Sequence, residues 1–370
     1  MSVLIISPQA WDAHPVSKHN YALTLAERGV RVLFLDPPTD GIPRTVTPVP
    51  DVPGLEVVRG PQVMRGLRYL PRVLRNLIEA RWLVDLERRT GERIETVWLF
   101  ENSRFFDMRF AADRLKIYHQ VDLVEDHHPR VAARTADIAL CTTDAIAAHL
   151  AGEETLVVKV HHGTVLHTDR DLPPEMANAF DPCRRHATLL GNLEMALLDY
   201  ATLLRMVIAH PDIIFHFMGD AKAQTPLRIA CEGCDNVMWW GRVAPHHVPA
   251  LLKRSDILLL AYRASEYADQ LASPHKLMEY LLSGRPIVAS WTAEYADKPG
   301  LIEMVSSDGD LAALFKQVID AIDIYDAPDR QTARRTFALD HTYGRQLNRI
   351  GEHLRDARLP VPFPISDTGA

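Results

Sequence analysis

A lysine and a glutamate near the end of the chain have the spacing of a nucleotide-binding pair. Lys276 and Glu279 lie three residues apart in the stretch SPHKLMEYLLSGRPIVAS, residues 273–290. On a helix they would share one face, where the helix N-terminus and the lysine attract phosphate. The glutamate, one turn further on, would meet vicinal hydroxyls, as acidic residues do with a ribose. An ordinary surface pair has the same spacing, so spacing alone leaves both interpretations open.

The same stretch predicts the ends of this helix. Ser273 is a favoured N-cap, and Pro274 suits the first helical position because proline has no N–H to satisfy. Gly284 suits a left-handed C-cap, and Pro286 prevents continuation. We therefore expect a helix of about ten residues, followed by a strand in the apolar run IVAS.

Length and composition indicate a two-domain globular protein. The chain has 370 residues, of which 47% are apolar and 24% charged. Such a length exceeds what one hydrophobic core usually serves, so we expect two domains with a cleft between them. No uncharged apolar run approaches the roughly 20 residues that span a bilayer. The N-terminus MSVLIISPQAWD carries no basic leader, and a cytoplasmic location is expected.

Several classes of site are disfavoured. The net charge of −7 argues against nucleic-acid binding. The four cysteines are too few and too irregularly spaced for a disulfide framework, and the pair Cys231 and Cys234 lacks the partners of a zinc site. The motifs of P-loop ATPases, dinucleotide-binding enzymes and H-E-x-x-H metal hydrolases do not occur.

Apolar runs alternate with amphipathic stretches in both halves of the chain, which predicts an α/β fold with two doubly wound parallel sheets. We expect a first domain at 1–168, a second at 169–327, a C-terminal helix at 328–357 that crosses back to the first domain, and a tail at 358–370. The polar, proline-containing segment at 167–185 is the predicted linker. Ligands bind such sheets beyond the carboxyl ends of their strands.

The stretch at 273–290 resembles the P-x-K-x-x-E-Y-x-x-x-G-x-P-V-V segment in the nucleotide-sugar domain of GT-B glycosyltransferases. The resemblance is to bacterial polysaccharide and cell-wall enzymes related to the teichuronic acid and glucuronosyl transferases. Other segments resemble these enzymes in the same order, so the resemblance covers most of the chain. They are WDAHPVSKHNYALTLAERGVRVLFLDPP, ADIALCTTDAIAAHL, HHGTV, ATLLGNLEMALLDYATLL and IIFHFMGD.

The resemblance implies a GT-B fold, in which two Rossmann-like domains face each other across a cleft. It implies that Lys276 contacts the diphosphate of a nucleotide-sugar donor and that Glu279 contacts the ribose or sugar. We expect a UDP or GDP donor and no metal, since the resemblance does not imply one. The donor-binding residues that we expect in the second domain are Lys276, Glu279, Ser273, Tyr280, Gly191, Asn192, Arg242 and Tyr262.

The chain departs from the family pattern at two places. Leu271 stands where many retaining members have a second glutamate, which leaves retention or inversion open. The turn after the first strand of the donor domain reads Gly191, Asn192, Leu193, Glu194, where many members carry an arginine and a lysine. The charge on the phosphates would then be met mainly by Lys276, with Arg242 or Arg263 as helpers.

The candidate base lies in the first domain. Transfer to a hydroxyl with inversion needs a general base, and KIYHQVDLVEDHH places Asp122, with His119 in reserve, at the end of a predicted strand. Either residue could instead be an ordinary polar residue of the loop. The first loop, with Trp11, Asp12, His14 and Lys18, is expected to contact acceptor or sugar, although Lys18 could equally be a solvated charge.

Arginines alternate with leucines between residues 65 and 89, which suits either an anionic membrane surface or a solvated helix face. Pro71 argues against one unbroken helix there. The function expected is transfer of a sugar from a nucleotide diphosphate-sugar to a saccharide or lipid-linked acceptor in polysaccharide or cell-surface glycan synthesis. The alternatives are a nucleotide-sugar 2-epimerase and a noncatalytic nucleotide-sugar-binding subunit.

Overall fold

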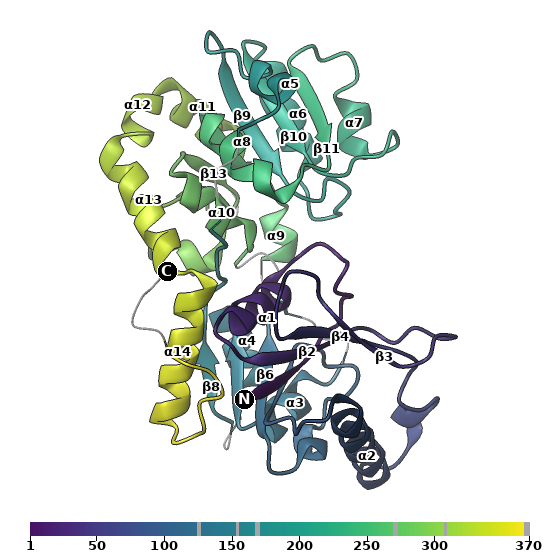
Figure 1. The fold of residues 1–370 in the computed structure, drawn as a ribbon. Helices are drawn as coiled ribbons and strands as arrows, with labels where there is room; N and C mark the ends of the chain where they lie inside the picture. Colours follow the sequence, from purple (N-terminus) through teal and green to yellow (C-terminus); the bar gives the residue numbers. More distant parts are fainter. Residues whose placement is uncertain (124–126, 153–154, 167–170, 269–272, 307–308, 366–370) are drawn as a thin grey trace. The chain divides into compact units, whose positions relative to one another are not determined.

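The computed structural model describes residues 1–123, 127–152, 155–166, 171–268, 273–306 and 309–365. The chain forms two compact units (Figure 1). The first unit comprises Met1–His162 with Tyr343–Ala370, and the second comprises Gly163–Thr342. Each unit is built on its own sheet.

The first unit has an eight-stranded sheet in the order β3-β4-β2-β1-β5-β6-β7-β8, parallel except for the pair β3 and β4. Its strands are β1 (Ser2–Ile6), β2 (Arg31–Leu35), β3 (Thr45–Pro48), β4 (Leu55–Arg59), β5 (Thr96–Leu99), β6 (Leu115–Gln120), β7 (Ile138–Cys141) and β8 (Val157–Lys159). Strand β1 is buried along its whole length, because a parallel sheet covered on both faces buries consecutive residues.

Helices α1 (Ser17–Glu27), α2 (Arg72–Thr90), α3 (Pro129–Thr135), α4 (Asp144–Leu150) and α14 (Tyr343–Asp356) accompany this sheet, with the short 3₁₀ turns η1 (Leu67–Tyr69) and η2 (Met108–Ala111). The strand order reverses at β1, since β2 and β5 pair with opposite edges of that strand. Such a reversal creates a crevice at the carboxyl ends of the strands. Pro71 separates η1 from α2, so the arginine-rich stretch is not one helix.

The second unit has a six-stranded parallel sheet in the order β11-β10-β9-β12-β13-β14. Its strands are β9 (Arg185–Leu190), β10 (Ile213–Met218), β11 (Val237–Gly241), β12 (Ile257–Leu260), β13 (Ile287–Ala289) and β14 (Glu303–Met304). Around the sheet lie α5 (Pro174–Asn178), α6 (Tyr200–Ala209), α7 (Pro226–Ala230), η3 (Pro245–His247), α8 (Val248–Arg254), α9 (Ala264–Tyr267), α10 (Lys276–Ser283), η4 (Ala293–Tyr295), α11 (Leu311–Asp320), α12 (Ile322–Tyr325) and α13 (Pro328–Asp340).

The C-terminal segment differs from the single helix that the sequence predicts. Helix α13 ends at Asp340 and α14 begins at Tyr343 (Figure 1). The break is held by Thr164, whose backbone N–H donates to the His341 carbonyl at 2.9 Å and which pairs with Thr342. The chain leaves the second unit at this break, and α14 belongs to the first unit.

Within the described ranges, no helix is both long and apolar enough to cross a membrane.

Candidate functional site

Lys276 lies where the strands of the second unit end. Its amine donates a hydrogen bond to the carbonyl of Leu190, the last residue of β9, at 2.8 Å. The side chain is mostly buried, and the amine lies 5.7 Å from the centre of the Tyr262 ring. Lys276 is also the first residue of α10, so its charge adds to the positive end of the helix. Positive charge is therefore concentrated at this end of the helix.

Two glycines provide the room for this lysine. An ideal Cβ on Gly191 would lie 1.9 Å from the Lys276 Nζ atom, and one on Gly219 would lie 1.7 Å from the Gly191 carbonyl oxygen. Both glycines have positive φ angles, 140° and 150°, which other residues rarely adopt. The turns after β9 and β10 therefore approach each other closely, and the turn after β9 also approaches the lysine.

Tyr280 fixes the helix that carries the lysine. Its hydroxyl accepts the backbone N–H of Leu190 at 2.8 Å and donates to the Leu259 carbonyl at 3.2 Å. The side chain is fully buried, and burial raises the pKa of the phenol well above its usual range. Tyr280 thus ties α10 to β9 and β12 and acts as a positioning residue.

The other expected donor-side residues surround this centre. Glu279 is half-buried, and desolvation raises the pKa of its carboxyl, an effect that the nearby Lys276 charge opposes. The backbone N–H of Tyr262 donates to Ser290 Oγ at 2.9 Å, which holds the ring beside the lysine. Asn192 is exposed and its side-chain oxygen accepts the Glu194 N–H at 3.0 Å.

Arg242 and Arg263, which were expected to help Lys276 bind the phosphates, form ion pairs with acidic side chains. Arg242 is exposed and forms an ion pair with Asp220 at 2.6 Å. Arg263 pairs with Glu266 at 3.0 Å and donates to the Ala196 carbonyl. The structure thus brings Lys276, Gly191, Tyr262 and Tyr280 together directly. Gly219 is a member that the sequence analysis missed, although a glycine directly after the apolar run IIFHFM is a signal for such a turn.

The predicted start of the lysine helix was wrong. Helix α10 begins at Lys276, so Ser273 is not its N-cap and Pro274 is not its first residue. The Leu277 N–H donates to the Pro274 carbonyl at 3.1 Å, which closes a tight turn ahead of the helix. Ser273 is buried. Leu271, where the family departure was noted, lies outside the described residues.

Asp122 and Lys18 lie at the carboxyl edge of the sheet in the first unit, where their charges interact. Asp122 is exposed and follows β6, while Lys18 lies in the first turn of α1. Desolvation lowers the pKa of Lys18 to about 8, and the charges of Asp122 and Glu101 act in the opposite direction. Glu101, in the loop after β5, is a third member that the sequence analysis did not name.

His119 is buried in the core of the first unit, whereas a catalytic base must reach its substrate. Its ring is 1% exposed and packs against Phe100 and Trp98 at centroid distances of 4.8 and 6.0 Å. Neither ring nitrogen has a hydrogen-bond partner among the residues that the structure describes. Burial lowers the pKa of this imidazole to about 3, so it is a neutral core residue that does not reach solvent. This placement argues against His119 as the base.

The first loop supports an ion-pair cluster. The Trp11 N–H donates to Asp36 at 2.8 Å, and its ring meets Phe34 edge-on at 5.0 Å. Asp12 pairs with Arg59 at 2.7 Å, and Arg59 also pairs with Asp36 at 2.9 Å. His14 is exposed. Asp12 and Asp36 therefore hold Arg59, and the Trp11 backbone holds Asp36.

Part of the second unit is similar in sequence to known glycosyltransferases. Residues 189–323 match the family model described as glycosyl transferases group 1. A glycosyltransferase named for teichuronic acid biosynthesis, TuaH of Bacillus subtilis, is 30% identical over 119 residues, which are 30% of this chain and 28% of the relative. The match thus spans less than a third of that relative.

Solved structures share the fold of nearly the whole chain. Sucrose-phosphate synthase from Thermosynechococcus elongatus has a TM-score of 0.71 at 14% identity, covering 96% of this chain and 98% of its own. Anabaena HepE, solved in complex with UDP-glucose, has a TM-score of 0.68 at 15% identity, covering 96% and 100%. This chain has the GT-B glycosyltransferase fold, and its residues 189–323 match the group 1 family model. The fold class expected from the sequence is therefore confirmed.

Proposed function

We propose that this GT-B chain transfers a glycosyl group from a nucleotide diphosphate-sugar to a saccharide or lipid-linked saccharide in polysaccharide or cell-surface glycan synthesis. The observation that carries the proposal is the Lys276 amine, held 2.8 Å from the Leu190 carbonyl over Gly191 and Gly219. It lies inside the segment that matches the group 1 family. Support for a UDP donor comes from HepE, which was solved with UDP-glucose.

The roles that we propose for the site residues follow from the charge that develops during transfer and from the charge of each side chain. Loss of a nucleoside diphosphate leaves negative charge on its oxygens, and a fixed cation stabilises that charge. Lys276 supplies the cation, and the half-buried Glu279 accepts hydrogen bonds from hydroxyls of the ribose or sugar. Asp122, exposed beside Lys18, is the proposed base if the reaction inverts configuration. The proposal includes no metal, so chelation with EDTA should leave transfer unchanged.

Donor binding is the first test. A ligand that binds only the native protein raises its unfolding temperature. We would screen UDP, GDP, ADP, dTDP, CMP and their common sugars, and we expect a shift with one diphosphate family. Absence of a shift with every nucleotide would contradict the proposal.

The Lys276→Ala variant tests the residue. A charge-assisted hydrogen bond contributes about 1.5–3 kcal/mol, so the loss of Lys276 should weaken binding of the diphosphate roughly 10- to 100-fold by calorimetry. Lys316→Ala, which removes an exposed lysine from α11 in the same unit, should bind as the parent does. Unchanged affinity in Lys276→Ala would remove the assignment.

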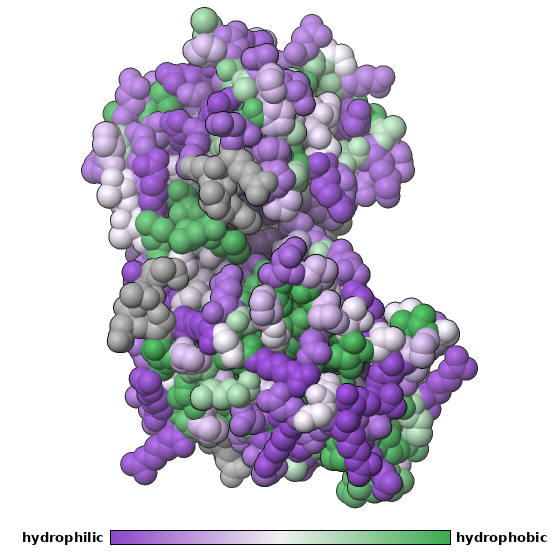
Figure 2. All heavy atoms as spheres, viewed as in Figure 1, coloured by the Kyte–Doolittle hydropathy of each residue, from purple (hydrophilic) through white to green (hydrophobic). Residues whose placement is uncertain are grey.

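We also propose that η1 and α2 contact an anionic membrane surface. Exposed arginines and exposed apolar residues share this segment, and Figure 2 shows hydrophobic and hydrophilic residues side by side over α2. Tyr69, Val73 and Leu77 are 76%, 79% and 56% exposed. Arginines attract anionic lipid while apolar side chains enter the interface. Binding to vesicles that does not depend on anionic lipid would contradict this contact.

A further inference from the structure

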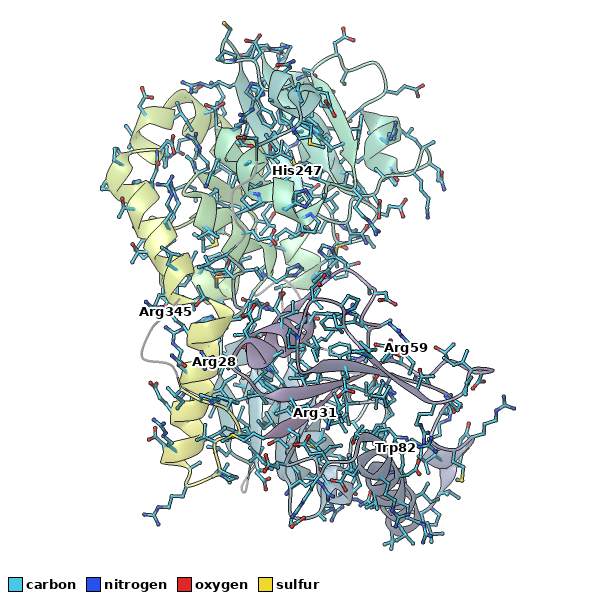
Figure 3. The ribbon with its side chains drawn as sticks, in the orientation of Figure 1. Arg28, Arg31, Arg59, Trp82, His247 and Arg345 are labelled. Atoms are coloured by element: carbon cyan, nitrogen blue, oxygen red, sulfur yellow. The ribbon has the colours of Figure 1, made fainter. Side chains whose placement is uncertain are left out.

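A cavity of about 460 Å³ opens in the first unit, beyond the carboxyl ends of β2 and β4. Arg59, at the end of β4, and Trp82, on α2, both line it (Figure 3). Arg104 and Phe105, from the loop after β5, line it as well. Small-molecule sites typically have roughly 300–1,000 Å³, so this cavity has the size of a binding site for one or two sugar rings.

Two buried side chains on α2 face the cavity with atoms left unpaired. Glu79 is 1% exposed and Arg75 is 7% exposed, and both line the cavity. Among the described residues, neither Glu79 Oε2 nor Arg75 Nε has a hydrogen-bond partner. Buried polar atoms are normally paired, because leaving one unpaired costs free energy. Both atoms are themselves buried, and the Glu79 carboxylate also interacts with the Phe105 backbone. A ligand therefore pairs them only when the two side chains turn toward the cavity, with the carboxylate accepting and the guanidinium donating.

The cavity has an excess of positive charge. Its lining includes the arginines Arg44, Arg59, Arg68, Arg75 and Arg104 and the acidic residues Asp36, Glu79 and Glu101, an excess of two positive charges when all are ionised. The ion pair between Arg75 and Asp107 is long, and Asp107 has other partners. Asp107 lies 3.9 Å from Arg75 and is also paired with Arg72 and Arg109. Desolvation raises the pKa of Glu79 to about 7, which reduces the negative charge opposite Arg75 at neutral pH.

Aromatic rings form much of the remaining wall. Trp82, Phe105, Phe106 and Tyr69 line the cavity, and the Arg75 guanidinium lies over the Phe106 ring at 4.0 Å. Ligand sites commonly combine such apolar walls with a few placed polar groups. Sugar rings match this combination, since their C–H faces pack on aromatic rings while their hydroxyls need donors and acceptors.

We propose that this cavity binds the anionic head of the acceptor, a saccharide that carries a phosphate or a carboxylate. Arg75 and Arg68 attract the anionic group, Glu79 accepts from a hydroxyl, and the aromatic walls exclude water. These residues select the acceptor and do not transfer a proton. The assignment rests on the proposed function because it names that reaction's acceptor, but the site is tested by binding alone, without donor.

In the first experiment, glucose 1-phosphate, glucuronate, glucose and inorganic phosphate are each titrated into the full chain without nucleotide. Saturation-transfer NMR measures the binding of each probe. Glucose 1-phosphate and glucuronate should bind about tenfold more tightly than glucose, because an ionic contact to an arginine adds to the sugar contacts. Inorganic phosphate should bind more weakly than glucose 1-phosphate. Equal binding of glucose, or of inorganic phosphate, would overturn the assignment of an anionic saccharide.

Two variants should shift this binding in opposite directions at pH 8. Arg75→Gln should weaken binding of glucose 1-phosphate about tenfold, and Glu79→Gln should strengthen it, because the change removes a negative charge from the cavity. Shifts of opposite sign do not arise from partial unfolding. Arg68→Gln changes an exposed rim residue and should also weaken binding, which keeps the test valid if Arg75→Gln does not fold. Unchanged affinity in Arg68→Gln and Glu79→Gln would overturn the proposal.

The controls separate this site from the donor site. Arg134→Gln removes an equal charge from α3, where the arginine is exposed and outside the cavity lining, and should leave probe binding unchanged. Lys276→Ala should leave the binding of glucuronate unchanged, because this probe has no phosphate for the lysine to contact, while the cavity variants should keep their affinity for UDP. If the parent protein binds the probes but not UDP, the result counts against the proposed function alone. If it binds UDP but not the probes, the result counts against the cavity assignment alone.

Discussion

At the scale of single residues, the two glycines beneath Lys276 differ in what a side chain would meet. A Cβ at Gly191 would meet the mobile end of a lysine side chain, whereas a Cβ at Gly219 would meet the backbone of Gly191. We expect Gly191→Ala to fold with a moderate loss of stability, of about 1–3 kcal/mol for the positive φ, and to lose affinity for UDP because the amine is displaced. Gly219→Ala should lose more stability, because backbone does not yield. Thermal unfolding and calorimetry with UDP would check both, and equal effects of the two substitutions on stability would contradict this geometry.

Glu79 makes stability depend on pH. Burial raises the pKa of its carboxyl from 4.5 to about 7, so between these values the folded protein holds a proton that the unfolded chain has lost. Stability should therefore fall as pH rises from 4.5 to 7, by up to about 3 kcal/mol. Glu79→Gln should remove this decline and be more stable than the parent above pH 7. Urea unfolding across this pH range measures the free energy of unfolding, and Glu352→Gln, at an exposed position on α14, serves as control. If the free energy of unfolding of Glu79→Gln still falls with pH as in the parent, Glu79 is not the cause.

Lys276 and Gly191 were named because of the resemblance in the segments around them, since spacing alone left the role of the lysine open. The structure places both at the end of β9, where the Lys276 amine contacts the Leu190 carbonyl. Tyr280 was named as a donor contact, but its hydroxyl is used by Leu190 and Leu259, which no spacing reveals. His119 failed as a base for the same reason, because the rings that bury it come from β5 and α1, far away in sequence.

At the scale of elements, apolar runs predicted only some of the strands. The strand predicted in KIYHQVDLVEDHH corresponds to β6 and the one predicted in IVAS to β13, whereas β3, β4 and β14 were not predicted. Helix ends were less predictable. The start of α10 and the break between α13 and α14 depend on hydrogen bonds outside the helix pattern, such as the contact from Thr164 to His341. Such bonds join segments that are distant in sequence.

The exposed apolar residues of α2 allow the proposed membrane contact to be tested. Val73 and Leu77 lie one turn apart and are largely exposed, so replacing both with aspartate should cost little stability. The double variant should lose binding to vesicles that contain phosphatidylglycerol, because it removes apolar contact and adds charge that anionic lipid repels. Co-sedimentation measures this. Ile208→Asp, an exposed change on α6, serves as control, and full retention of binding in the α2 variant would exclude this face.

At the scale of the whole molecule, the chain ends in the unit where it began. Helix α14 packs on α1, and the Tyr343 hydroxyl donates to Ser17 Oγ at 3.3 Å. Arg28 of α1 donates to the carbonyls of Gly344 and Pro364, at 2.6 and 2.8 Å. The sequence indicated a segment that crosses back, but the residue at which the chain changes units follows from these contacts. The first unit is therefore completed by α14, which follows the whole of the second unit in the sequence.

This path predicts that core substitutions in the two units act on different unfolding steps. Leu347 on α14 and Leu203 on α6 are both fully buried, the first in the first unit and the second in the second. Truncating either to alanine should cost about 2–5 kcal/mol. In calorimetry, Leu347→Ala should lower one transition and Leu203→Ala another. UDP should raise only the transition that Leu203→Ala lowers, because a ligand stabilises the unit that binds it. A single transition lowered equally by both variants would show instead that the two units unfold as one, and that the return of α14 couples their stabilities.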